Sequence, residues 1–294
     1  MPLPSRTKPS PKAAPVLDNP FGASTEIPDV GRFIMFYGPP GEGKTSLAAQ
    51  FDAPLFVITS GEQGIYHLKK SGVASKDIPV VQLDPLYPED SIPVGQGHPG
   101  WEKAIETLQV FCKGQHDRKT IVYDTTSGLE ALCFQHCASK QFGGDMESRT
   151  QDTWNHYANG PRKAASAYWQ AEFLNLCLEC KMKGYNVILL AHSTSKTVTN
   201  LDGPDYEIYQ PQLTNKVWDY TSKDLSDCMF LGKRMQFITD QKTKKRSVVG
   251  QERFIGVESS TWYVAKNWEN RHDEIEAGSS PAESYTNLMS AMKG

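Results

Sequence analysis

The sequence predicts an α/β fold in which helices flank both faces of a mainly parallel β-sheet. Three observations lead to this fold class. Between residues 32 and 192, short apolar runs alternate with segments of helical periodicity, which is typical of parallel strands buried on both faces. A glycine-rich loop separates the first apolar run from the first helix. After about residue 224 the pattern changes to one that predicts added antiparallel strands toward the C-terminus.

Strands and helices are expected to alternate along most of the chain. The parallel strands share a short apolar run, and they are expected at residues 33–37, 54–59, 120–124 and 186–192. The helices share apolar residues at helical spacing, and they are expected at residues 45–50, 102–112, 128–142 and 161–183. The antiparallel strands are expected at residues 229–239, 247–257 and 261–265.

The two ends of the chain differ in composition from its centre. Residues 1–30 are rich in Pro, Ser, Ala and Lys and cannot bury enough apolar surface to offset the entropy lost on ordering. They are therefore expected to form a flexible tail. Residues 31–276 contain every predicted strand and are expected to form the domain. Residues 277–294 are expected to form a C-terminal tail with a short helix at residues 284–292.

Composition and charge exclude several classes of protein. A net charge of -3 argues against a protein that coats nucleic acid through bulk charge, so any such contact requires a local basic patch. There is no run of about 18 apolar residues to cross a membrane, and the N-terminus lacks the apolar segment of a secretory signal. We therefore expect a cytoplasmic protein that makes no membrane contact and keeps its cysteines reduced.

Residues 38–45, GPPGEGKT, match the phosphate-binding pattern G-x-x-x-x-G-K-[ST]. Glycines let the backbone curl so that successive N–H groups point at phosphate oxygens, and the next helix adds the positive end of its dipole. Lys44 would bridge the β- and γ-phosphates of ATP, and the Thr45 hydroxyl would bind Mg²⁺. The residues expected to contact the nucleotide are Gly38, Pro39, Pro40, Gly41, Glu42, Gly43, Lys44, Thr45 and Ser46.

A carboxylate ends the third predicted parallel strand. Asp124 follows an apolar run and could hold the same Mg²⁺ ion as Thr45. A strand-end aspartate is also common as a simple cap, but a phosphate loop in the same sheet favours the metal role. The residues that follow it and could orient water are Thr125, Thr126 and Ser127.

Two further polar residues follow predicted strands. Glu62 comes after the strand at residues 54–59, where a carboxylate can polarise the water that attacks the γ-phosphate. His192 ends the strand at residues 186–192, where a neutral ring could sense the γ-phosphate and couple hydrolysis to the next loop. From spacing alone, an exposed loop glutamate and an ordinary structural histidine are equally acceptable interpretations.

Taken in chain order, the phosphate loop, Glu62, Asp124 and residues 184–192 resemble the RecA-like core. The chain is most similar to phage-type AAA nucleotide-binding proteins, which include RecA-like single-strand annealing recombinases of bacteriophages. The resemblance covers residues 33–271 and includes residues 264–267, VAKN. It implies a magnesium-dependent ATPase that acts in DNA recombination or annealing, with Glu62 as the base and His192 as the sensor. The catalytic residues that it implies are Lys44, Glu62, Asp124 and His192.

Two positions depart from the family pattern. Ser60 stands where the family usually has an aspartate, two residues before its glutamate. Trp268 stands where the family usually has an arginine, which leaves Lys266 or Arg271 as the nearest replacements. In this branch ATP usually lies between subunits and meets a cation from the neighbour, so a homo-oligomeric ring or filament is expected. The candidate cations are Lys233, Arg234 and Lys266.

The resemblance also implies a surface for single-stranded DNA. RecA-like proteins pass DNA along two mobile loops, and the segments at the matching places are residues 143–162 and 193–209. Both segments carry the cations and aromatic rings that sequence-tolerant binding requires, but they also carry acids, so ordinary polar loops with aromatic anchors remain the alternative. The residues concerned are Arg149, Trp154, His156, Tyr157, Arg162, Lys196, Tyr206 and Tyr209. A second candidate is the basic turn with Lys242, Lys244, Lys245 and Arg246.

Two other functions remain open at the level of the sequence. A small-molecule P-loop kinase would need an arginine-rich lid, and the nearest segment, residues 143–162, has two arginines. A nucleotide switch or scaffold would bind ATP and assemble without turnover.

Two cysteine groups have spacings that also suit zinc. They are Cys133 and Cys137 with His136, and Cys177 with Cys180. Both lie within predicted helices beside apolar residues, where free cysteine packs as a small hydrophobe, so packing is the favoured interpretation.

Overall fold

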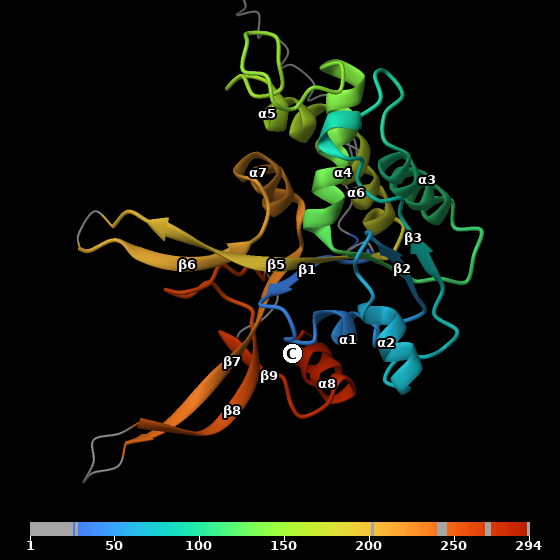
Figure 1. Cartoon of the computed structure of the whole chain (residues 1–294). Helices are drawn as coiled ribbons and strands as arrows, with labels where there is room; N and C mark the ends of the chain where they lie inside the picture. Colours follow the sequence, from blue (N-terminus) through green and yellow to red (C-terminus); the bar gives the residue numbers. More distant parts are fainter. Residues whose placement is uncertain (1–25, 27–28, 201–202, 240–245, 268–271, 293–294) are drawn as a thin grey trace, which may run out of the picture.

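The computed structural model describes residues 26, 29–200, 203–239, 246–267 and 272–292. These residues form one nine-stranded sheet with helices on both faces (Figure 1). Most of the expected N-terminal tail, residues 1–30, lies outside the described residues. None of the described helices is both long enough and apolar enough to cross a membrane.

The parallel strands occur where the apolar runs predict them. The five strands are β1 (Phe33–Gly38), β2 (Pro54–Ile58), β3 (Val80–Gln82), β4 (Thr120–Asp124) and β5 (Asn186–Val198). Four of the five were predicted. β3 was not, because three residues that remain partly exposed produce no apolar run.

Antiparallel strands extend the other edge of the sheet, as expected. They are β7 (Asp227–Thr239), β8 (Arg246–Gly256) and β9 (Glu274–Glu276). β7 pairs in parallel with β1 and in antiparallel orientation with β8. The strand expected at residues 261–265 is wrong, because this segment forms no named strand and its Tyr263 makes only an isolated bridge to Tyr209. The short β9 takes the place beside β8 instead.

The strand order separates the phosphate-loop strand from the strand that ends in Asp124. The order is β3-β2-β4-β5-β1-β7-β8-β9, so β5 lies between β1 and β4. In the kinase-like branch of P-loop proteins these two strands are neighbours. The order therefore agrees with the RecA-like core that the sequence predicts.

The alternation of side chains along the strands divides the core into two layers. In β1, Ile34 and Phe36 pack on one face, whereas Phe33, Met35 and Tyr37 pack on the other. The first face is covered by α1 (Lys44–Ala48), α2 (Gly64–Ser71) and α8 (Pro281–Ala291). The second is covered by α3 (Pro99–Lys113), α4 (Thr126–Gln141), α6 (Asn175–Met182) and α7 (Asn215–Asp224).

The long helix expected at residues 161–183 is present but not uniform. It consists of α5 (Gly160–Ala164), a π-helical segment (Ala165–Leu174) and α6. A short 3₁₀ helix (Glu89–Ser91) precedes α3. Neither α2 nor α7 was predicted, because each buries only one or two side chains and so has little apolar periodicity.

The prediction of a loop at residues 193–209 is wrong for residues 193–198 and 206–209, which form strands. β5 continues past His192 to Val198 and pairs with β6 (Tyr206–Pro211) in antiparallel register. Figure 1 shows this hairpin projecting from the body of the sheet. The apolar run ends at His192, but the following residues include β-branched Thr194, Thr197 and Val198, which favour extended backbone.

The helix expected near the C-terminus is confirmed as α8, and it packs on the domain. Ser280 caps its first turn, accepting a hydrogen bond from Glu283 N at 3.2 Å. Leu288 and Met292 are buried in the same apolar layer as α1, and the Tyr285 ring lies 5.0 Å from that of Phe51.

Candidate nucleotide-binding site

The phosphate loop joins β1 to α1, and its backbone is curled. Gly41 and Gly43 have φ angles of 82° and 84°, in the left-handed region that favours glycine. A Cβ at Gly38 would collide with the carbonyl oxygen of Leu231 on β7, so close approach of the two strands also requires glycine there. A backbone curled in this way directs successive N–H groups toward one point, which suits an anion.

Lys44 is the first residue of α1 and is buried. Its Nζ donates hydrogen bonds to the carbonyl oxygens of Gly38 and Pro39, both at 2.9 Å. Burial lowers the pKa of Lys44, and nearby carboxylates oppose this effect, most strongly that of Asp124. The ammonium thus spans the loop in a site where water is scarce, so its attraction for a phosphate is stronger than in bulk solvent.

Thr45 and Asp124 lie in direct contact beneath the loop. The Thr45 hydroxyl donates a hydrogen bond to Asp124 Oδ2 at 2.9 Å. Asp124 ends β4 and is 4% exposed. Burial raises the pKa of Asp124 from 3.8 to about 6, against the opposing hydrogen bond from Thr45. The sequence predicted this pairing, although the two residues are 79 positions apart.

The oxygen atoms of Thr45 and Asp124 suit Mg²⁺. This ion prefers oxygen ligands, keeps several waters and usually takes only one or two ligands from the protein when substrate phosphates supply others. Among the described residues, no group of three or more His, Cys, Asp and Glu side chains could hold a metal ion without such help. The donor set therefore fits a magnesium ion that arrives with a nucleotide.

Glu62 and His192 come together at the same edge of the sheet. Glu62 Oε1 lies 3.6 Å from His192 Nε2, and each side chain is about one-third exposed. His192 is the register partner of Gly38 across the parallel β1–β5 pair, so it lies next to the start of the phosphate loop. His192 Nδ1 is buried and makes no hydrogen bond. The structure thus brings together all four predicted catalytic residues: Lys44, Glu62 and Asp124 at or after the carboxyl ends of β1, β2 and β4, and His192 within β5.

Comparison with known proteins places this site in a family. A family model described as an AAA domain matches residues 31–268, which include every residue of the site. The chain belongs to this AAA domain family. Among solved structures, the flagellar accessory protein FlaH from Methanocaldococcus jannaschii is similar, with 11% identity and a TM-score of 0.40 over 84% of this chain and 85% of that chain. No curated protein matches the chain.

Some polar residues of the AAA domain site serve its scaffold. Thr125 Oγ1 accepts a hydrogen bond from Gly128 N at 3.3 Å and caps α4. Thr126 Oγ1 donates to the carbonyl oxygen of Leu190 at 2.9 Å and joins α4 to β5. Both hydroxyls, which were expected to orient water, therefore hold secondary structure together.

Two residues near the loop were missed at the sequence level. The hydroxyl of Thr59, after β2, accepts a hydrogen bond from Thr125 N at 3.3 Å and fixes the backbone beside Asp124. Arg253 on β8 donates a hydrogen bond to the carbonyl oxygen of Glu42 within the phosphate loop. No pattern in the sequence distinguishes Arg253, since its contact depends on the pairing register of two late strands.

The three cations considered for contact with a neighbouring subunit have partners within the chain. Lys233 Nζ lies 3.1 Å from Glu42 Oε1. Arg234 forms an ion pair with Glu274. The Nζ of Lys266 donates to three carbonyl oxygens at the end of α7, those of Ser222, Lys223 and Leu225. Trp268 and Arg271 lie outside the described residues.

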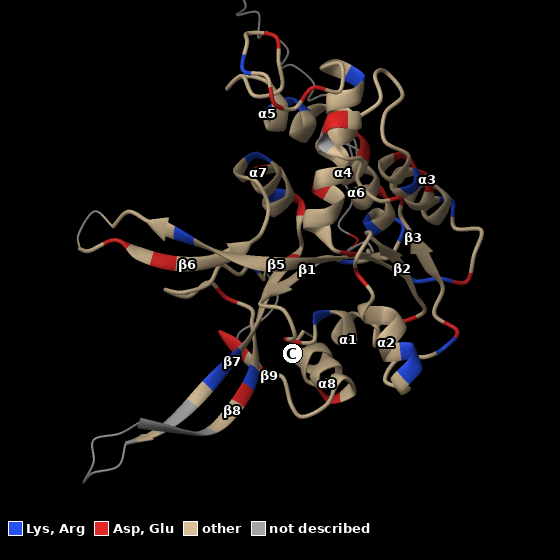
Figure 2. Ribbon diagram, viewed as in Figure 1, with Lys and Arg blue, Asp and Glu red and all other residues tan. Residues whose placement is uncertain are grey.

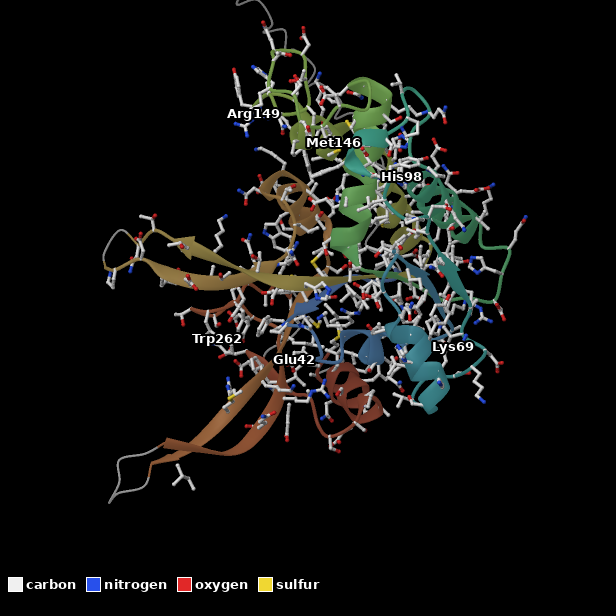
Figure 3. The ribbon with its side chains drawn as sticks, viewed as in Figure 1. Glu42, Lys69, His98, Met146, Arg149 and Trp262 are labelled. Carbon is white, nitrogen blue, oxygen red and sulfur yellow. The ribbon has the colours of Figure 1, made fainter. Side chains whose placement is uncertain are left out.

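The first segment considered for DNA binding is anchored by one of its own aromatic rings. Trp154 is 4% exposed, and its ring lies 5.3 Å from that of Phe134 and 5.7 Å from that of Phe142. Its ring therefore holds the segment on the domain and is not open to stacking. Tyr157 is 86% exposed, and Arg149 is also exposed (Figure 3). Acidic and basic side chains are interspersed in this part of the chain (Figure 2).

The hairpin segment also offers accessible groups. Lys196 is exposed, and Tyr206 and Tyr209 are 41% and 40% exposed, although the Tyr209 ring also stacks on Phe230 at 5.8 Å. Of the basic turn, Lys242, Lys244 and Lys245 lie outside the described residues.

All six cysteines are buried, in line with the packing interpretation. Burial raises the pKa of the Cys133, Cys137, Cys177 and Cys180 thiols, which therefore stay protonated at neutral pH. The described part of the chain contains no group of these residues able to hold zinc.

The Asp124→Asn variant is expected to be more stable than the wild type. Because folding raises the pKa of Asp124 from 3.8 to about 6, the contribution of this group to the free energy of unfolding is largest below pH 3.8. That contribution falls by about 3 kcal/mol as the pH rises through 6 and the carboxyl group ionises. Asparagine removes the charge, so the melting temperature of the variant at pH 7.5 should exceed that of the wild type.

The stability difference should also depend on pH. Thermal unfolding should show a smaller difference in melting temperature between the wild type and Asp124→Asn at pH 5 than at pH 7.5. Equal differences at both pH values would mean that the Asp124 carboxylate is not desolvated as described.

Proposed function

We propose that this protein binds ATP with Mg²⁺ at residues 38–46 and hydrolyses it. The observation that supports this most strongly is the convergence of a curled phosphate loop with Lys44, the Thr45–Asp124 pair and the Glu62–His192 pair. Lys44 and Thr45 come from α1, Asp124 from β4, His192 from β5, and Glu62 from the segment after β2. Together they supply what triphosphate hydrolysis requires: hydrogen-bond donors to phosphate, metal ligands and a base.

Each residue has a distinct role in the proposed reaction. Lys44 would leave the loop carbonyls to contact the β- and γ-phosphates. Thr45 and Asp124 would hold a magnesium ion, which would supply positive charge to balance that of the phosphate oxygens. Glu62 orients the attacking water and accepts its proton. A carboxylate that is one-third exposed can reach water and a nucleotide without first leaving a buried site.

His192 connects the proposed chemistry to the β5–β6 hairpin. It contacts Glu62 at 3.6 Å, and β5 runs on from it without a break to Val198. A change in the Glu62–His192 contact when the γ-phosphate binds or leaves would therefore be transmitted to the hairpin along a rigid strand.

We propose further that the protein acts on single-stranded DNA, in recombination or annealing, as the resemblance to phage-type proteins implies. The accessible groups that support this are Tyr157 and Arg149 in one segment and Lys196 and Tyr206 in the hairpin. Exposed rings stack on bases of any sequence, and the cations attract the backbone. A homo-oligomeric ring or filament in the cytoplasm, with ATP between subunits, remains part of this proposal.

ATP hydrolysis with and without single-stranded DNA tests the proposed function. We expect magnesium-dependent turnover that increases about tenfold or more when a single-stranded oligonucleotide is added at low salt. Tyr157→Ala with Lys196→Ala should lose the stimulation and keep the basal rate, because neither residue lies at the phosphate loop. Tyr66→Ala, which removes a ring that is 41% exposed and lies outside both segments, is the control.

The other outcomes favour the rival functions. Transfer of the γ-phosphate to a small acceptor would indicate a kinase. Tight binding of ATP without turnover, with or without DNA, would indicate a nucleotide switch or scaffold.

A further inference from the structure

Two cations of the β7–β8 hairpin contact the phosphate loop from outside. Lys233 on β7 and Arg253 on β8 are register partners in the antiparallel pair, so they lie side by side. Lys233 Nζ is 3.1 Å from Glu42 Oε1, and the Arg253 guanidinium donates a hydrogen bond to the carbonyl oxygen of the same glutamate. Glu42, at the junction between the loop and these strands (Figure 3), is thus held through both its side chain and its backbone.

The Glu42 carboxylate is buried within the phosphate loop. Its side chain is only 10% exposed, and its Oε2 is buried with no hydrogen-bond partner. A buried carboxylate next to the place where a triphosphate binds would repel the nucleotide unless a cation balanced it. Lys233 is that cation, and its own side chain remains 34% exposed, so it also faces solvent.

Arg253 fills the space beside the left-handed turn of the loop. A Cβ added at Gly43 would collide with the Arg253 guanidinium, so the arginine lies directly against this glycine. A cavity of only about 40 Å³ remains between the loop, the hairpin and α8, and Gly43, Ser46 and Arg253 line it. The loop therefore has little freedom to move toward β8 while the arginine is present.

We infer that Lys233 and Arg253 are positioning residues of the phosphate loop. Arg253 fixes the loop backbone at Glu42 and Gly43, so that its N–H groups stay directed at the phosphate position. Lys233 balances the Glu42 charge, so that the loop accepts a polyanion. The second statement rests on the proposed function, namely ATP binding at this loop, whereas the first concerns the conformation of the loop itself.

Hydrogen exchange in the nucleotide-free protein tests the role of Arg253. We expect Arg253→Ala to increase the exchange rate of the amides in residues 38–46 by about tenfold, with partial recovery in Arg253→Lys. Arg234→Ala is the matched control, since it removes an ion pair from the neighbouring position on β7 without touching the loop. Exchange in Arg253→Ala equal to that of the wild type and the control would overturn this part of the inference, whether or not the protein binds ATP.

Equilibrium binding of a fluorescent ATP analogue with Mg²⁺ tests the role of Lys233. Lys233→Met should raise the dissociation constant by about tenfold, because it leaves the Glu42 carboxylate unbalanced. The double variant Glu42→Gln with Lys233→Met should return to within about threefold of the wild type, because neither charge remains. An unchanged constant in Lys233→Met, or no recovery in the double variant, would contradict the inference. A wild type that fails to bind would instead refute the proposed function, and the exchange result would still stand.

Discussion

Replacing Lys44 with alanine is expected to weaken ATP binding by at least about 100-fold and to reduce turnover below detection, because the proposed charge-assisted contacts to the β- and γ-phosphates are removed. The Nζ already bridges the carbonyl oxygens of Gly38 and Pro39, so it lies at the mouth of the loop. Titration of the variant with ATP and Mg²⁺ by calorimetry, followed by a turnover assay, measures both effects.

The fold of this variant should remain intact. Burial lowers the pKa of Lys44, so the folded state disfavours its charge, and this offsets the loss of its hydrogen bonds to Gly38 and Pro39. Circular dichroism and thermal unfolding should therefore show a folded variant. Lys103→Ala is the matched control, because its Nζ also donates to a backbone carbonyl, that of Gln82 at 2.9 Å, but far from the loop. Normal ATP affinity in Lys44→Ala would mean that Lys44 does not bind the phosphates of ATP.

The Glu62→Gln variant is expected to bind ATP with nearly wild-type affinity and to lose hydrolysis by about 100-fold to 10,000-fold, the usual contribution of a general base. Glutamine has the same shape and can still contact His192, but it cannot accept a proton from water. Single-turnover measurement of phosphate release, together with the dissociation constant for ATP, separates the loss of chemistry from any loss of binding.

The matched control for this variant is Glu102→Gln. Glu102 Oε1 also lies beside a histidine, 3.9 Å from His136 Nδ1, but on α3 and outside the site. It should hydrolyse ATP at the wild-type rate. If Glu62→Gln released phosphate as fast as this control, another group would have to act as the base, and the proposed role of Glu62 would be abandoned.

The parallel core and the phosphate site were predictable because their signals are local. Each buried strand is a continuous apolar run, and the phosphate loop has a fixed spacing of glycines, Lys44 and Thr45. The carboxyl ends of parallel strands meet at one edge of the sheet, whatever the order of the strands. That rule was sufficient to predict that Asp124, Glu62 and His192 would lie near the loop.

The features that were missed depend on contacts between distant segments. The β5–β6 hairpin alternates polar and β-branched residues with no apolar run, so it resembled a loop. The sequence left open whether Trp154 is a stacking ring or an aromatic anchor, and only its contacts with Phe134 and Phe142 show that it is an anchor. The register between β7 and β8, which brings Arg253 to the phosphate loop, cannot be predicted from the sequence of either strand alone.

Comparing the affinities for ATP, ADP and AMP in the presence of Mg²⁺ tests most directly whether residues 38–45 bind a nucleotide through its phosphates. If the loop amides and Lys44 bind the β- and γ-phosphates, ATP and ADP should bind at least about 100-fold more tightly than AMP, since AMP lacks both groups. AMP binding as tightly as ATP, or no binding of any nucleotide by the folded protein, would contradict the account.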